Sequence, residues 1–217
     1  MTHTAKQAVV DAKAILFDFD GVLLDSEWPI YQTWLKLFQR EGQDLPPETY
    51  VKCIGSDFDT WSPEKHLEDL TGKTFDWEPE NAARQIEIMR DLANALPEPG
   101  VIELLESLSS KPTAVVSSSS HSWVDSWLEK LDLESHFIKT VCRGDAPRIK
   151  PAPDLYLEAA KQLELSPSEC LVIEDSLNGM LSAHEAGMKV IAVPSQLTGV
   201  LDFSAAEWQV ESLAELV

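Results

Sequence analysis

Two aspartates that lie one residue apart follow a short apolar run near the start of the chain. Residues 14–17 read as a buried strand, and Asp18, Asp20 and Gly21 follow it. Strands of parallel sheets are nearly continuous apolar runs, and ligands bind outside their carboxyl ends. Two carboxylates at such an end repel each other, so a proton, a lysine or a metal ion should compensate them. A solvated turn is the alternative interpretation, because Asp and Gly are common turn residues.

Other polar side chains follow apolar runs farther along the chain. Ser117 comes directly after a β-branched run, and Glu174 and Asp175 come directly after another apolar run. Because the carboxyl ends of parallel strands lie along one edge of a sheet, we expect these side chains to converge with the aspartate pair. Lys150, in a loop before a helical pattern, can join them.

Such a set of residues is suited to phosphoryl transfer through a covalent aspartate. A carboxylate can attack phosphorus and divide one difficult step into two easier ones. A hard cation bound by several oxygens would neutralise both the acids and the phosphoryl oxygens. A lysine and a hydroxyl would hold the remaining negative charge.

The elements that must position these residues follow two different patterns. From about residue 28 to residue 95 the apolar spacing is helical, with no convincing strand. Before and after that stretch, apolar runs alternate with helical patterns, which predicts a parallel sheet covered on both faces. We therefore expect an α/β core of residues 1–27 and 96–217, interrupted by an all-helical insert of residues 28–95.

The expected boundaries can be stated for each element. Apolar runs predict strands at residues 14–17, 113–116, 140–142, 170–173 and 189–193. Helical patterns cover residues 29–40, a short segment starting at 46–47, and residues 63–70, 79–96, 101–108, 122–131, 153–163 and 177–186.

The composition limits the class of partner. A net charge of −20 repels nucleic acid and anionic membrane, so we expect neither as a partner. No apolar run reaches 18 residues, and the N-terminal segment lacks the features of a signal peptide. Three cysteines without a close pair fit a reducing compartment. We expect a cytoplasmic protein that acts on a small molecule and, by default, a monomer.

Four motifs, in this order, resemble those of the haloacid dehalogenase superfamily. They are Asp18-Phe19-Asp20-Gly21-Val22, Ser117, Lys150-Pro151-Ala152-Pro153-Asp154 and Glu174-Asp175-Ser176. The insert resembles the small C1-type cap of that superfamily. The most similar subgroup contains β-phosphoglucomutase and many sugar-phosphate phosphatases. The resemblance implies a Rossmann-like parallel-sheet core with an inserted helical cap, and a phosphorylated metabolite as substrate.

The resemblance also implies two catalytic residues in the first motif. Asp18 would be the nucleophile and become an aspartyl phosphate. Asp20 would protonate the leaving alcohol and then deprotonate the water that hydrolyses the intermediate.

The remaining motifs would bind the phosphoryl group and the metal. Ser117, the backbone N–H of Ser118 and Lys150 would hold the phosphoryl oxygens. The expected cofactor is Mg²⁺, and its ligands would be Asp18, the backbone carbonyl of Asp20, Asp175, and Glu174 directly or through water. Ser119 or Ser120 is expected instead to cap the following helix.

The choice of reaction depends on residues in and near the first motif. Dehalogenases of the superfamily lack the second acid of that motif, so Asp20 argues against a carbon–halogen substrate. Mutases of the subgroup carry a histidine where this chain has Ile30, and an arginine after the cap-loop glycine, where this chain has Gly55-Ser56-Asp57-Phe58. An aspartate there would repel a second phosphate.

We therefore expect a magnesium-dependent phosphatase that hydrolyses a small phosphomonoester, such as a sugar phosphate, through an aspartyl phosphate. A β-phosphoglucomutase-type phosphomutase is the alternative. A non-enzymatic phospho-aspartate receiver module is less favoured, because receivers are about half this length. Cap residues select the substrate in this family, and the candidates here are Gly55, Ser56, Asp57 and Phe58.

Overall fold

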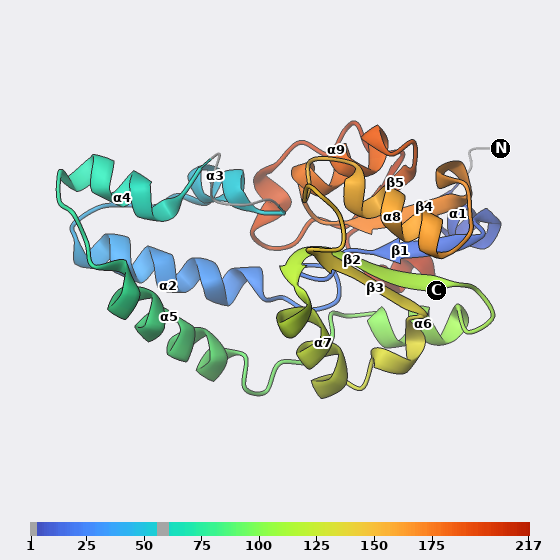
Figure 1. Ribbon diagram of the computed structural model, residues 1–217, viewed down its shortest axis with the longest axis horizontal. Coiled ribbons are helices and arrows are strands. Elements are labelled where there is room, and N and C mark those ends of the chain that lie inside the picture. Colours follow the sequence, from blue (N-terminus) through green and yellow to red (C-terminus); the bar gives the residue numbers. More distant parts are fainter. Residues whose placement is uncertain (1–3, 56–60) are drawn as a thin grey trace.

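The computed structural model describes residues 4–55 and 61–217, and a parallel β-sheet flanked by helices forms one end of it (Figure 1). The strands lie in the order β3-β2-β1-β4-β5-β6, and each neighbouring pair is parallel. They are β1 (Ala14–Phe17), β2 (Thr113–Ser120), β3 (Lys139–Arg143), β4 (Cys170–Glu174), β5 (Lys189–Ala192) and β6 (Trp208–Gln209). The order reverses between β1 and β4, where α/β sheets bind ligands. The expected Rossmann-like α/β fold is confirmed.

Helices cover both faces of the sheet. On one face Ile15 and Phe17 share a buried cluster with residues of α1 (Ala5–Asp11), α6 (Val101–Ser107) and α7 (His121–Lys130). On the other face Ala14 and Leu16 share a cluster with residues of α8 (Asp154–Gln162) and α9 (Leu177–Glu185). Burial on both faces explains why β1 is apolar throughout rather than alternating.

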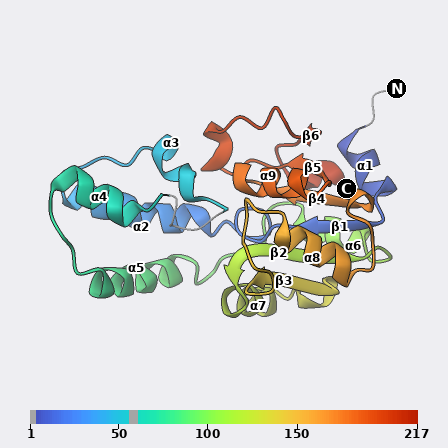
Figure 2. The same ribbon diagram turned by 45° about the horizontal axis from the view of Figure 1, so that its top comes forward.

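The segment between β1 and α6 forms a helical region that extends away from the sheet, as both views show (Figures 1 and 2). Its helices are α2 (Glu27–Arg40), α3 (Pro47–Tyr50), α4 (Pro63–Thr71) and α5 (Trp77–Asp91), and none of its described residues forms a strand. We call residues 28–95 the cap. It has its own buried cluster, which includes Trp34, Phe38 and Leu67. The Arg84 guanidinium of α5 lies 3.3 Å from the Trp34 ring centroid of α2, which ties these two helices together.

One cap helix ends earlier than its apolar spacing predicts. The spacing predicts a helix over residues 79–96, whereas α5 ends at Asp91. Leu92 packs into the cluster that α6 and α7 share, and Lys130 donates a hydrogen bond to its carbonyl. The carbonyl is therefore satisfied without another helical turn, and Leu96 is exposed.

Three other features differ from the sequence-based expectation. Helix α1 and the two-residue strand β6 were not predicted, because both are too short to show a clear apolar period. Strand β2 continues through Ser120 instead of ending at Val116.

No helix in the described ranges has the length and apolarity needed to cross a bilayer.

Candidate active site

The central strands bring three of the predicted motifs to one edge of the sheet. Phe17 of β1 is in register with Val115 of β2 and with Ile173 of β4. Asp18 and Glu174 therefore lie one residue beyond a common row, and Ser117 lies two residues beyond it. This placement follows directly from the parallel register.

Lys150 joins this edge from the loop before α8, and its side chain is buried. Its Nζ donates hydrogen bonds to Asp18 Oδ1 at 2.6 Å, to Glu174 Oε1 at 2.7 Å and to the Val116 carbonyl at 2.8 Å. Burial alone would lower the pKa of Lys150, but the charges of Asp18 and Glu174 raise it above its ordinary value. The lysine therefore stays protonated and compensates the acids.

Glu174 is saturated with hydrogen bonds. Its Oε1 also accepts from Tyr156 Oη at 2.9 Å, and its Oε2 accepts from the backbone N–H of Asp175 and from both the N–H and the hydroxyl of Ser176. A Cβ at Gly179 would lie 1.7 Å from Oε1, so only glycine fits beside this carboxylate. Glu174 is thus held in one orientation between Lys150 and α9.

Asp175 differs from Glu174 because one of its buried oxygens has no partner. Oδ1 accepts no hydrogen bond within the described structure, whereas Oδ2 accepts a long one, 3.4 Å, from Thr198. Burial, followed by the charges of Glu174 and Asp18, raises the pKa of Asp175 well above its ordinary value. A Cβ at Gly21, which has a φ of +84°, would lie 2.1 Å from Oδ2. The first-motif glycine therefore permits the close approach of this acid.

The acidic groups fit a hard cation. Oxygens of Asp18, Glu174 and Asp175 lie within 4.8 Å of one another. Burial and the charge of Glu174 raise the pKa of Asp18 to about 7, which an added cation would oppose. Carboxylate oxygens suit Mg²⁺, and the unpartnered Asp175 Oδ1 is the oxygen most in need of such a partner. Because Glu174 is already saturated, its contact with a metal through a water fits better than a direct bond.

Asp20 lies beside Asp18 and is held by three donors from different elements. Its Oδ1 accepts from Ser26 Oγ at 2.5 Å and from Trp123 Nε1 at 2.9 Å, and its Oδ2 accepts from Ser119 Oγ at 2.6 Å. Ser119 therefore does not have the capping role that was one of the two expected alternatives. Ser120 occupies the N-cap position of α7, but its hydroxyl makes no capping hydrogen bond.

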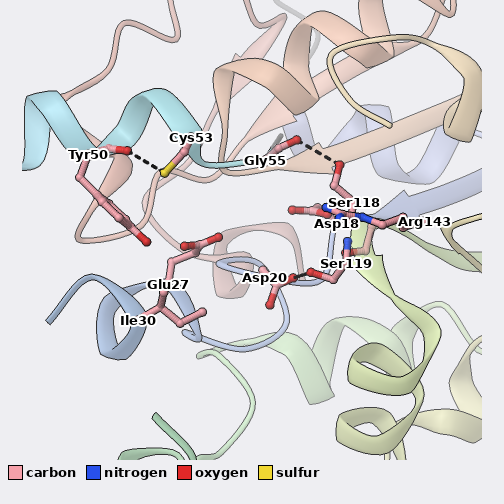
Figure 3. Close-up of a pocket in the computed structure, with 11 residues that line it drawn as sticks. Asp18, Asp20, Glu27, Ile30, Tyr50, Cys53, Gly55, Ser118, Ser119 and Arg143 are labelled. Atoms are coloured by element: carbon pink, nitrogen blue, oxygen red, sulfur yellow. Dashed lines mark hydrogen bonds between the residues drawn. The ribbon is translucent and has the colours of Figure 1, made fainter. Parts of the chain in front are cut away.

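The carboxylates open into a cavity of about 190 Å³ between the core and the cap (Figure 3). Its core side is formed by Asp18, Asp20, Arg143 and the serines Ser117, Ser118 and Ser119. Its other side is formed by Glu27 at the start of α2 and by four cap residues, Ile30, Tyr50, Cys53 and Gly55. Of the site residues expected from the sequence, Lys150, Glu174 and Asp175 lie behind this lining. The cavity is therefore closed on one side by the compensated acids and on the other by the cap.

The cap loop touches the core directly above the site. Ser118 Oγ donates to the Gly55 carbonyl at 3.1 Å, and Asn178 Nδ2 donates to the Ile54 carbonyl at 2.7 Å. Gly55 thus lies at the cavity, as a specificity residue would. The other three candidates, residues 56–58, lie outside the described residues.

Two charged residues of the cavity were missed by the sequence-based reasoning. Arg143 ends β3, and its Nε donates to the Ser118 carbonyl at 2.9 Å. Arg143 directly follows the strand predicted at residues 140–142, so the same search for polar side chains at strand ends could have identified it. Glu27, the first residue of α2, had no sequence signal beyond its place after the first motif.

Comparisons with known proteins agree with this geometry. Residues 15–193 match the family described as "Haloacid dehalogenase-like hydrolase". The chain is 35% identical over 206 residues to the putative phosphatase YhcW of Bacillus subtilis (strain 168), covering 94% of this chain and 93% of that protein. It is 28% identical over 182 residues to the fructose-1-phosphate phosphatase YqaB of Escherichia coli (strain K12), covering 82% and 95% respectively.

A solved structure shows the same architecture. The crystal structure of a putative beta-phosphoglucomutase from Thermotoga maritima superposes with a TM-score of 0.73 at 25% identity, over 94% of this chain and 96% of that one. The family match covers most of the chain, so the receiver-module alternative is excluded. The chain belongs to the haloacid dehalogenase-like hydrolases, and it is a phosphatase of that family.

Proposed function

We propose that this phosphatase is magnesium-dependent and hydrolyses a small phosphomonoester, a sugar phosphate or a similar metabolite, through an aspartyl phosphate at Asp18. The observation that carries the proposal is the position of Asp18. Its carboxylate lines the cavity, with Lys150 Nζ at 2.6 Å on the inner side and Ser117 at the neighbouring strand end.

The first half of the reaction forms the covalent intermediate. A carboxylate oxygen of Asp18 attacks phosphorus, and the bond between phosphorus and the leaving oxygen breaks. Asp20 gives its proton to that oxygen, so the product leaves as a neutral alcohol. The Ser117 hydroxyl and the backbone N–H of Ser118 hold the phosphoryl oxygens, while Lys150 balances the charge around Asp18.

The second half regenerates the enzyme. Asp20, now ionised, takes a proton from a water molecule, and the water oxygen attacks the phosphorus of the aspartyl phosphate. The bond between phosphorus and the Asp18 oxygen breaks, which releases inorganic phosphate. Hydrogen bonds from Ser26, Ser119 and Trp123 keep the Asp20 carboxylate in place for both proton transfers.

Asp18, the Asp20 carbonyl and Asp175 would hold Mg²⁺, with Glu174 bound through a water. When bound, the ion supplies charge neutralisation for the acids and the phosphoryl oxygens.

Hydrolysis is favoured over phosphoryl transfer within a sugar by the residue at position 30. Ile30 lines the cavity beside Asp20 and Glu27, and an apolar side chain there can neither donate nor accept a proton. The relatives with phosphatase names, including the fructose-1-phosphate phosphatase of Escherichia coli, support a small phosphorylated carbohydrate as substrate.

The proposal is tested by phosphate release from a panel of sugar phosphates and p-nitrophenyl phosphate, with and without Mg²⁺. We expect turnover that needs Mg²⁺, no turnover by Asp18→Asn, and a loss of roughly 10²–10⁴-fold for Asp20→Asn. The matched control is Asp69→Asn, because Asp69 is an exposed cap residue that pairs with Lys65. Appreciable turnover by Asp18→Asn, or none by the wild type on any substrate, would contradict the proposal.

A further inference from the structure

The cavity at Asp18 continues into a second chamber between the cap and the core. This chamber, of about 550 Å³, shares lining residues Asp20, Glu27 and Arg143 with the first cavity. It extends to Gln85 on α5 and to Trp123 on α7. Because Asp20 stands between the two spaces, the phosphoryl group belongs in the first and the leaving group in the second.

Among the described residues, none is a hydrogen-bond or ion-pair partner of the Glu27 carboxyl group in this space. Its side chain points from the start of α2 into the cavity, between Asp20 and the cap residues Tyr50 and Cys53 (Figure 3). No described residue donates a hydrogen bond to it. By contrast, two glutamates of the cap are paired, Glu80 with Arg40 and Glu87 with Lys36. A half-buried carboxyl group that faces the chamber and lacks a donor from the described protein is available to bond the molecule that fills the chamber.

The charges around Glu27 indicate what kind of donor fits. Burial, and then the charges of Asp20, Asp18 and Asp25, raise the pKa of Glu27 to about 8. A carboxyl group can hydrogen-bond a hydroxyl in either protonation state, as donor when neutral and as acceptor when ionised. Among the described residues of the lining, two acids, Asp20 and Glu27, outnumber the one cation, Arg143, so a second anionic group in the chamber would be repelled on balance.

We propose that Glu27 binds a hydroxyl of the leaving group close to the scissile phosphoester. It thereby selects phosphomonoesters whose leaving group is uncharged and carries several hydroxyl groups. The proposal rests on the phosphatase function proposed above. Glu27 is a specificity-determining residue, distinct from the cap-loop segment expected from the sequence. A site built to bond a substrate hydroxyl discriminates strongly against an analogue that lacks it, because its own polar group is then left unpaired.

The experiment compares two phosphomonoesters that differ in hydroxyl groups, glycerol 3-phosphate and propyl phosphate, and follows phosphate release. In the wild type we expect kcat/KM to be at least about tenfold higher for glycerol 3-phosphate. Glu27→Ala should bring the ratio of the two kcat/KM values close to one. Glu27→Gln should restore most of the ratio, because an amide still bonds a hydroxyl.

The matched control is Glu78→Gln, the same change on an exposed acid in the first turn of α5, which should leave the ratio unaltered. A ratio that Glu27→Ala leaves at the wild-type value, or equal losses on both substrates, would overturn the role of Glu27. Absence of wild-type turnover on these two and on p-nitrophenyl phosphate would overturn the phosphatase function itself. The two failures are therefore distinguishable.

Discussion

Lys150 Nζ lies 2.6 Å from Asp18 Oδ1, and both side chains are buried. The same ammonium group lies 2.7 Å from Glu174 Oε1. One cation thus compensates two acids from two different strands, at the edge of the sheet where they converge. Removal of this cation leaves buried negative charge without compensation, which affects both folding and chemistry.

Lys150→Met should abolish turnover and lower stability. Breaking a buried ion pair from one side costs about 3–5 kcal/mol, because the remaining charge stays buried. Urea unfolding in metal-free buffer measures the loss, and phosphate release measures activity. Lys161→Met is the control, because Lys161 is exposed and pairs with Glu158 within α8. A Lys150→Met variant as stable and active as this control would contradict the compensating role.

Trp123→Phe should lower kcat about tenfold with little change in KM, since one hydrogen bond to a charged group contributes roughly 1.5–3 kcal/mol. The substitution removes the indole N–H that donates to Asp20 Oδ1 but keeps an aromatic ring. Trp77→Phe is the matched control: it removes an indole N–H bonded to Glu68, outside the cavity. If both variants behave like the wild type, Trp123 does not position Asp20.

Arg143→Gln should raise KM about tenfold, because a charge-assisted hydrogen bond to the substrate contributes roughly 1.5–3 kcal/mol. Among the described residues that line the first cavity, Arg143 supplies the positive charge. The increase should shrink at high salt, since screening weakens the attraction of an exposed guanidinium for an anion. Steady-state kinetics at low and high salt measure both effects. Arg90→Gln, on the exposed surface of the cap, serves as control. An equal KM for the two variants would show that Arg143 does not bind the substrate.

Glu27→Gln should stabilise the protein increasingly as pH rises from about 5 to 8. The pKa of Glu27 is raised to about 8 in the folded protein, so the folded state binds more protons than the unfolded state over this range. The contribution of Glu27 to stability therefore falls with rising pH, whereas glutamine does not titrate. The difference in Tm between variant and wild type, measured without metal at several pH values, should grow with pH. A difference independent of pH would show that Glu27 titrates normally.

Much of the site could be predicted because it follows from strand register. Asp18, Ser117 and Glu174 each end an apolar run, and parallel pairing alone brings such ends together. Lys150 was found through its motif, and its buried position between Asp18 and Glu174 agrees with that prediction. The site residues that belong to the core could therefore be predicted from local sequence patterns.

The contacts between the cap side of the cavity and the core depend on how the cap packs over the core. No local sequence pattern predicts that packing. Glu27 enters the cavity only because α2 begins directly above Asp20. Ser119 was assigned to helix capping, a local role, whereas its hydroxyl bonds Asp20, a contact across 99 residues of sequence. Helix α5 ends where Leu92 meets the core, which is again a tertiary contact.

The central claim is that Asp18 becomes phosphorylated during turnover. Acid quenching within the first turnover, followed by peptide mass spectrometry, tests it most directly. We predict one phosphoryl group on the peptide that contains Asp18 in the wild type, and none in Asp18→Asn, which also fails to turn over. Turnover with no phosphorylated Asp18 at any quench time, or a phosphoryl group on another residue, would contradict the account.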